Sequence, residues 1–264
     1  MLDKILAHKR IEIERLNLAE LKVRAKDAPE PRAFLPPLPV GEGGGASVRL
    51  IAELKRASPS RGLLAPHLDM LELAQIYAAN GASALSVLTD EKFFLGRLTT
   101  LYDLRVTNRI SLPLLRKDFI LSEAQLYETR AAGADAVLLI AAGITEDTEL
   151  AELHELALAL GLTPLVEAHD ESELERVLRL PNLKLVGVNN RNLKTFDISL
   201  DTTARLRPLV PPGLPLVSES GIFTVAHVAQ LAALGVDAVL VGEALVTAPD
   251  IGAKVRELSG WVIG

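Results

Sequence analysis

Charged and amide side chains follow several short apolar segments, at the points where those segments end. Glu53 and Lys55 close the segment RLIAELK, and because they are two positions apart, an extended strand would place both side chains on one face. Carboxylates interleaved with lysines could perform general acid–base chemistry, because neighbouring charges shift the pKa of each group. The other residues that follow apolar segments in this way are Lys117, Glu167, Asn189, Arg191, Glu219 and Ser220.

Repeated strand and helix patterns between residues 48 and 264 could bring these side chains together. Stretches of helical period alternate with eight continuous apolar segments, a character typical of parallel strands buried on both faces. The segments are VRLIAEL, ALSVL, LPLLR, AVLLI, TPLVE, KLVGV, LPLVS and AVLVG. Three units, NGASALSVL, AGADAVLLI and LGVDAVLVG, place a glycine where a helix should end. The pattern predicts an α/β fold, a (β/α)8 TIM barrel, with an open doubly wound sheet as the alternative.

In such a barrel the carboxyl ends of all strands meet at one face, where barrel enzymes keep their active sites. We therefore expect Glu53, Lys55, Lys117, Glu167 and Glu219 to form one site. Backbone N–H groups after the seventh and eighth strands often bind phosphate in this fold. The candidates for phosphate binding are Ser220–Gly221, Gly242 and, from the first loop, Ser58.

The first 45 residues follow a different pattern. Residues 3–26 have amphipathic spacing and predict an additional N-terminal helix. Residues 29–45 are rich in proline and then in glycine, which excludes a helix or a central strand. The run GEGGG is better explained as a connector than as a phosphate loop, because neither GxGxxG nor a following Lys-Ser/Thr pair is present. We expect one domain, with residues 1–45 as helix and connector and 46–264 as the barrel.

Composition narrows the functional classes. The 264 residues include 28 Lys and Arg against 34 Asp and Glu, and no Cys. The absence of Cys excludes a disulfide scaffold, a Cys-ligated metal and a cysteine nucleophile. The acidic balance disfavours nucleic acid and anionic membrane surfaces as partners, and the sequence predicts no obligatory protein partner. A secretory signal and a run of ~18 apolar residues are both missing, so we expect a cytoplasmic protein.

The five histidines favour neither a catalytic triad nor a metal site. They fall mainly on predicted helices or loops and include no closely spaced pair. His154 and His227 are expected on helix faces. His169 lies two residues beyond Glu167, in a segment where Asp170 or Ser172 is expected to cap a helix.

Seven blocks of the sequence are long enough to be compared with known families: IAELKRASPSRG, LSVLTDEKFFLG, LPLLRKDFI, LVEAHD, VGVNNRNLKTF, VSESGI and VLVGEAL. In these blocks, and over nearly its whole length, the chain resembles the indole-3-glycerol-phosphate synthases of tryptophan biosynthesis. The N-terminal helix and connector are similar to the extension that this family adds before its barrel.

The resemblance implies ring closure of 1-(2-carboxyphenylamino)-1-deoxyribulose 5-phosphate with loss of CO2 and water, without a cofactor or metal. By motif position, Lys117 would protonate the substrate ketone and Glu167 would act in the dehydration. Glu53 would position or share that role, and Lys55 would supply a second cation. The remaining residues implied by the resemblance are Asn189, Arg191, Glu219 and Ser220 for substrate, Phe94 and Phe119 beside its aromatic ring, and Ser58, Gly221, Gly242 and Glu243 for phosphate, the last through its backbone N–H only.

Three alternatives give different expectations. Phosphoribosylanthranilate isomerase has a similar barrel but employs a catalytic cysteine, which this chain lacks. A Schiff-base aldolase would use Lys117 or Lys55 as nucleophile. A catalytically silent phosphate-binding barrel would not need the full acid–base set.

Overall fold

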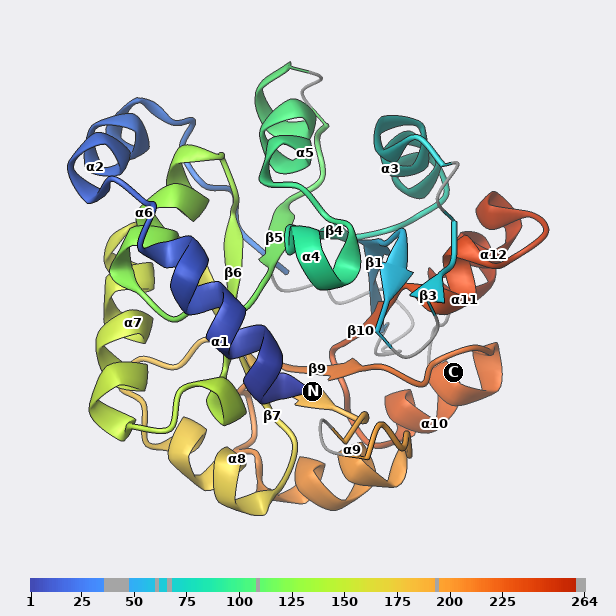
Figure 1. Ribbon diagram of the computed structural model, residues 1–264. Coiled ribbons are helices and arrows are strands. Elements are labelled where there is room, and N and C mark those ends of the chain that lie inside the picture. The colour runs from blue at the N-terminus through green and yellow to red at the C-terminus, as the bar shows by residue number, and fades with distance from the viewer. Residues whose placement is uncertain (36–47, 60–61, 66–67, 108–109, 193–194, 260–264) are drawn as a thin grey trace.

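A computed structural model of the chain contains a closed barrel of eight parallel strands (Figure 1). The structure describes residues 1–35, 48–59, 62–65, 68–107, 110–192 and 195–259. Each predicted apolar segment contains one barrel strand, so the predicted TIM barrel is confirmed and the open sheet is excluded. In chain order the barrel strands are β1 (Arg49–Leu54), β4 (Ala84–Leu88), β5 (Leu114–Lys117), β6 (Ala136–Ile140), β7 (Thr163–Ala168), β8 (Val186–Asn189), β9 (Leu216–Glu219) and β10 (Ala238–Val241).

Strand β1 closes the barrel by pairing with both β10 and β4. A short antiparallel hairpin that the sequence did not predict follows β1; its strands are β2 (Ala57–Ser58) and β3 (Gly62–Leu63). The first strand of this hairpin, β2, carries Ser58 shortly after β1 in the chain.

Helices surround the barrel and join successive strands (Figure 1). Their bounds are α1 (Leu2–Ile13), α2 (Leu18–Asp27), α3 (Met70–Ala79), α4 (Glu91–Phe94), α5 (Leu98–Tyr102), α6 (Glu123–Ala131), α7 (Asp147–Ala159), α8 (Glu171–Leu178), α9 (Asp201–Leu206), α10 (Val225–Ala233), α11 (Glu243–Val246) and α12 (Ile251–Ser259). Gly81, Gly133 and Gly235 each adopt a positive φ just after a helix, as the three repeated sequences predicted.

Alternation along the strands explains how one fold holds both a core and a polar face. On several strands, one residue contributes to an apolar cluster inside the barrel, and the residue two positions later points the same way but is polar. Four such pairs are Ile51 and Glu53, Leu115 and Lys117, Leu165 and Glu167, and Val217 and Glu219. The intervening residues pack outward against the helices.

The N-terminal segment forms two helices, so the prediction of one helix over residues 3–26 was wrong. Asn17 caps α2, its side-chain oxygen accepting a hydrogen bond from the Glu20 backbone N–H at 3.2 Å. An asparagine at this position stabilises a helix start and therefore interrupts the amphipathic run. Helix α1 crosses the barrel mouth in Figure 1, while Phe34 and Leu35 join the interior apolar cluster. Residues 36–45 of the predicted connector, with GEGGG, lie outside the described residues.

Candidate active site

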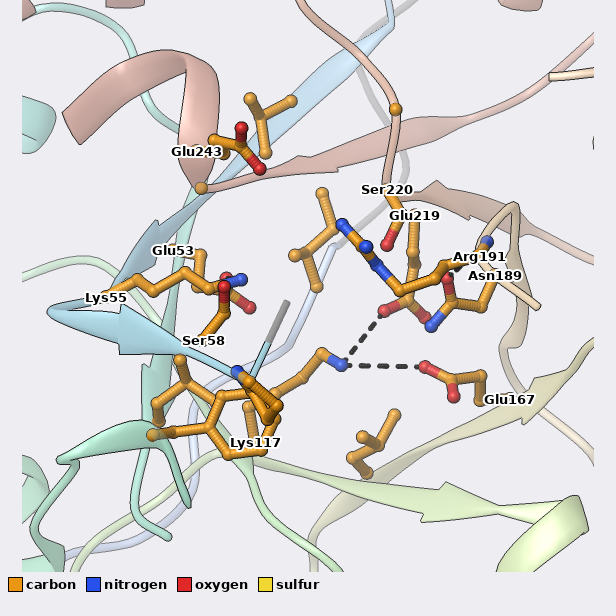
Figure 2. Close-up of a pocket in the computed structure, with 18 of the residues that line it drawn as sticks. Glu53, Lys55, Ser58, Lys117, Glu167, Asn189, Arg191, Glu219, Ser220 and Glu243 are labelled. Atoms are coloured by element: carbon orange, nitrogen blue, oxygen red, sulfur yellow. Dashed lines mark hydrogen bonds and ion pairs between the residues drawn. The ribbon is translucent and has the colours of Figure 1, made fainter. Parts of the chain in front are cut away.

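A pocket at the carboxyl ends of the strands brings together every predicted site residue (Figure 2). Met1, Leu2 and Ile5 of α1 also line it, so the N-terminal helix forms part of the wall. The predicted residues that line the pocket are Glu53, Lys55, Ser58, Phe94, Lys117, Phe119, Glu167, Asn189, Arg191, Glu219, Ser220, Gly221, Gly242 and Glu243.

The ammonium group of Lys117 lies between two carboxylates inside the barrel (Figure 2). Its Nζ is 3.4 Å from Glu219 Oε2 and 3.5 Å from Glu167 Oε2. Burial would lower the pKa of Lys117, but the negative charges of Glu219, Glu167 and Glu53 outweigh burial and raise that pKa above its ordinary value. Lys117 is therefore protonated at neutral pH and can donate a proton.

The two carboxylates beside Lys117 have opposite pKa shifts. Burial would raise the pKa of Glu167, but Lys117 and His169 outweigh it and lower that pKa. Burial and the negative charge of Glu167 raise the pKa of Glu219 to about 8, although Lys117 opposes the shift. Two neighbouring carboxylates whose pKa values differ in this way can have different roles in proton transfer.

Glu53 and Lys55 form a second ion pair on the first strand. Lys55 Nζ lies 3.0 Å from Glu53 Oε1, which agrees with the prediction that their side chains share a face. The backbone at Gly242 packs against Glu53, since a Cβ on that glycine would lie 2.5 Å from Glu53 Oε1. The backbone that follows β10, the eighth barrel strand, thus packs closely against Glu53, and a larger side chain at Gly242 would displace it.

Two phenylalanines form an apolar part of the pocket. The rings of Phe94, at the end of α4, and Phe119, just after β5, have centroids 6.2 Å apart at an interplanar angle of 37°. This spacing is within the range of aromatic pairs, and both rings line the pocket. They provide a surface against which an aromatic ligand could pack.

The loop after β9 has an unusual backbone. Ser220 and Gly221 both adopt left-handed conformations, with φ of 68° and 79°. The Asn190 amide stabilises this loop by donating to the carbonyl oxygens of Glu219 and Ser220, at 3.0 and 3.1 Å. Asn190 was not predicted; its position directly after Asn189, in a buried strand end, is the only signal the sequence offers.

His169 is a second residue beside the site that was not predicted from the sequence. The predicted cap is confirmed, because Asp170 accepts a hydrogen bond from the Glu173 backbone N–H at 2.9 Å. His169 itself, however, lies with Nε2 3.2 Å from Glu167 Oε1. Its spacing of two from Glu167, at the end of the same strand, was the available signal.

The other two histidines considered above have the positions expected of helix residues. His154 is completely buried on α7, where burial lowers its pKa, and His227 lies on α10. In the part of the chain that the structure describes, no group of three or more His, Asp or Glu side chains is arranged to hold a metal ion. None of the helices in the described ranges combines the length and the apolar character that a membrane span requires.

Comparisons with solved structures identify the fold. A structure of KGPDC from Streptococcus mutans superposes with a TM-score of 0.61 over 81% of this chain and 96% of that one, at 11% identity. Thiamine phosphate pyrophosphorylase from Pyrococcus furiosus gives a TM-score of 0.56 over 80% of this chain and 93% of that one, at 16% identity. At these identities the likeness shows the barrel fold alone.

Comparisons of sequence are more specific. The family model for indole-3-glycerol phosphate synthase matches residues 2–258. The indole-3-glycerol phosphate synthase of Roseiflexus castenholzii is 51% identical, over 98% of both chains. The enzyme of the same name from Desulforamulus reducens is also 51% identical, over 98% of this chain and 96% of that one. With the pocket residues gathered at the barrel mouth as the shared motifs implied, the chain belongs to the indole-3-glycerol phosphate synthase family.

Proposed function

We propose that this chain closes the indole ring of its substrate, 1-(2-carboxyphenylamino)-1-deoxyribulose 5-phosphate, and releases CO2 and water. The observation that carries the mechanism is the Lys117 ammonium placed between two buried carboxylates at the barrel mouth. The aromatic carbon bearing the carboxylate attacks the substrate ketone, CO2 leaves, and loss of water completes the ring. No electrons enter or leave in this sequence, so the reaction needs no redox cofactor.

Lys117 is the proposed general acid for the first step. A new carbon–carbon bond at the ketone pushes electrons onto the carbonyl oxygen, which must gain a proton or a compensating charge. Glu219, Glu167 and Glu53 keep Lys117 protonated, because they raise its pKa despite burial. The ammonium is therefore charged before substrate arrives and needs no reorganisation.

Glu167 and Glu53 are proposed for the proton transfers of dehydration. The pKa of Glu167 is lowered, which makes it a carboxylate that can accept a proton as the hydroxyl leaves. Glu53 lies beside Lys55, and the pair positions or shares this transfer. Lys55 supplies the second cation of the site.

The remaining pocket residues are proposed to bind the two ends of the substrate. Phe94 and Phe119 pack against the aromatic ring, and Asn189, Arg191, Glu219 and Ser220 hold the chain that bears the hydroxyl groups. Ser58 and the backbone N–H groups of Gly221, Gly242 and Glu243 bind phosphate, since helix starts and left-handed turns present N–H groups to anions. We also propose that the chain works as one cytoplasmic domain, with 1–45 as extension and 46–264 as barrel.

Indole fluorescence that develops when the purified protein is mixed with the substrate tests the reaction. We expect turnover by the wild type and a loss of about 100- to 10,000-fold for Lys117→Ala. Circular dichroism of the variant serves as the control for folding. Absence of product from the folded wild type would exclude the reaction, and near-normal turnover by Lys117→Ala would exclude Lys117 as the acid. Trapping of a covalent adduct by borohydride would instead favour Schiff-base chemistry.

A further inference from the structure

His169 lies between two carboxylates at the end of β7. Its Nε2 is 3.2 Å from Glu167 Oε1, and its Nδ1 is 2.9 Å from Glu173 Oε2 on α8. The same Glu173 oxygen accepts a hydrogen bond from the His169 backbone N–H at 2.8 Å. Backbone and ring together thus fix the orientation of the imidazole relative to α8.

This arrangement divides the two oxygens of Glu167 between different partners. Oε2 faces Lys117 on β5, while Oε1 faces His169. In the described part of the chain, Glu219 on β9 also lies beside Glu167, and Asp170 also lies beside His169. The His169 side chain is 9% exposed and that of Glu173 is 17% exposed, so the row of three runs from the site toward the protein surface.

An imidazole between two carboxylates is stabilised as the imidazolium, because both negative charges favour the cation. We propose that His169 is a positioning residue for Glu167: as a cation it holds Oε1 and keeps Glu167 ionised, while Glu173 holds the cation in place. The proposal rests on the role of Glu167 as a proton acceptor in the proposed function. His169 does not touch the reacting atoms and acts through Glu167.

The charge balance of the surroundings agrees with this role. Burial would lower the pKa of His169, but Glu167 and Glu173 outweigh burial and raise it to about 10. Without His169, Glu167 would keep Lys117 as its cation but would share it with Glu219. Proton uptake by Glu167 would then become easier, and the acceptor would be lost at low pH.

The first test measures the charge of His169 in the wild-type protein. The imidazole signals are followed by NMR against pH, and His169 is assigned by its absence from the spectrum of His169→Asn. We expect His169 to titrate above the ordinary value of ~6.5 and to move toward that value in Glu167→Gln and in Glu173→Gln. Titration at or below ~6.5 in the wild type would overturn the proposal, whether or not any variant folds.

The second test compares the pH dependence of turnover. An opposite charge within reach lowers the pKa of a carboxylate by about 1–3 units, so His169→Asn should shift the acidic limb of kcat upward by that amount. Glu173→Gln should shift it less, and KM should change less than kcat. Glu175→Gln is the matched control, because Glu175 is an exposed carboxylate on the same helix that pairs with Arg179.

The outcomes separate this proposal from the one on which it rests. A folded His169→Asn whose kcat falls equally at every pH, or does not change, overturns the positioning role. If Glu167→Gln keeps full activity, the role of Glu167 in the reaction fails instead, and the NMR titration still reports whether His169 is a cation between the two carboxylates as proposed. An upward limb shift together with a raised His169 pKa supports both.

Discussion

Lys9 of the N-terminal helix lies with its Nζ 2.9 Å from Asp118 Oδ1, and Asp118 directly follows the end of β5. The same Nζ is 3.1 Å from Asp90 Oδ2, and the Lys9 side chain is only 3% exposed. Each aspartate fixes backbone next to a pocket phenylalanine: Asp90 caps the helix that carries Phe94, and Asp118 accepts a hydrogen bond from the Phe119 N–H at 2.8 Å. One lysine therefore connects α1 to both aromatic side chains.

We expect Lys9→Met to lower the free energy of unfolding by about 3–5 kcal/mol, because the buried carboxylates of Asp90 and Asp118 both lose a cation, although Asp118 keeps Arg116 at 3.2 Å. Urea denaturation followed by circular dichroism measures the change. Lys4→Met is the control, since Lys4 is exposed on the same helix. A Lys9→Met protein within about 0.5 kcal/mol of the wild type would show that the contact contributes little.

Phe119→Leu should raise KM by roughly 2- to 10-fold and change kcat less, because an aromatic contact is worth about 0.5–1.5 kcal/mol beyond the area it buries. Steady-state kinetics with the carboxyphenylamino substrate provide both constants. Tyr102→Leu removes an exposed aromatic ring outside the pocket and should leave KM unchanged. Equal KM values for Phe119→Leu and wild type would place the substrate ring elsewhere.

Glu219→Gln should change how stability depends on pH. Because the pKa of Glu219 is raised to about 8 in the folded protein, the native state keeps this proton after the unfolded chain has released it. The wild type therefore loses stability as pH rises from about 4.5 through about 8, and the neutral glutamine removes that loss.

The free energy of unfolding, measured across this pH window, should fall less steeply for Glu219→Gln than for wild type. The difference should reach about 1–3 kcal/mol at the alkaline end. Glu175→Gln removes an exposed carboxylate on α8 that pairs with Arg179, and this variant is expected to follow the wild-type curve. Parallel curves for Glu219→Gln and wild type would mean that Glu219 is ionised throughout.

Gly187→Ala should reduce kcat by about 10- to 100-fold, because small displacements of site groups are costly. A Cβ at Gly187 would lie 2.5 Å from Glu219 Oε1 and 3.2 Å from Leu165 Cδ1, so Glu219 would have to move. Gly143→Ala is the comparison variant, since its new Cβ would meet Leu6 only at an ordinary 3.5 Å. If both alanine variants keep wild-type kcat, the site tolerates movement of Glu219.

The strands and the residues that end them could be predicted because both depend on local spacing. The carboxyl ends of all strands of a barrel meet at one face, so Lys117 and Glu167 could be assigned to that face without coordinates. The break between α1 and α2 was missed because the apolar spacing continues through it, while the cap at Asn17 decides the boundary.

Contacts between distant segments could not be predicted in the same way. Lys9 appears in the sequence as one charge on an amphipathic helix, and only the fold reveals that it is buried beside Asp118. In the sequence, Gly187 is a residue type that disfavours strands. Its small size matters because the Glu219 side chain occupies the space where a Cβ would lie. Such roles depend on which distant segments come into contact. Contacts of this kind leave no local pattern in a single sequence.

The carboxylates around Lys117 have a consequence for protein engineering. The Glu219 carboxyl group is completely enclosed, lies 3.4 Å from the Lys117 ammonium, and has its pKa raised to about 8 by burial and the negative charge of Glu167. A laboratory selection for heat resistance alone should thus enrich uncharged residues at position 219 and yield thermostable variants without turnover. Libraries for a more durable biocatalyst would have to screen for product formation in every round, because at this position robustness and catalysis favour different side chains.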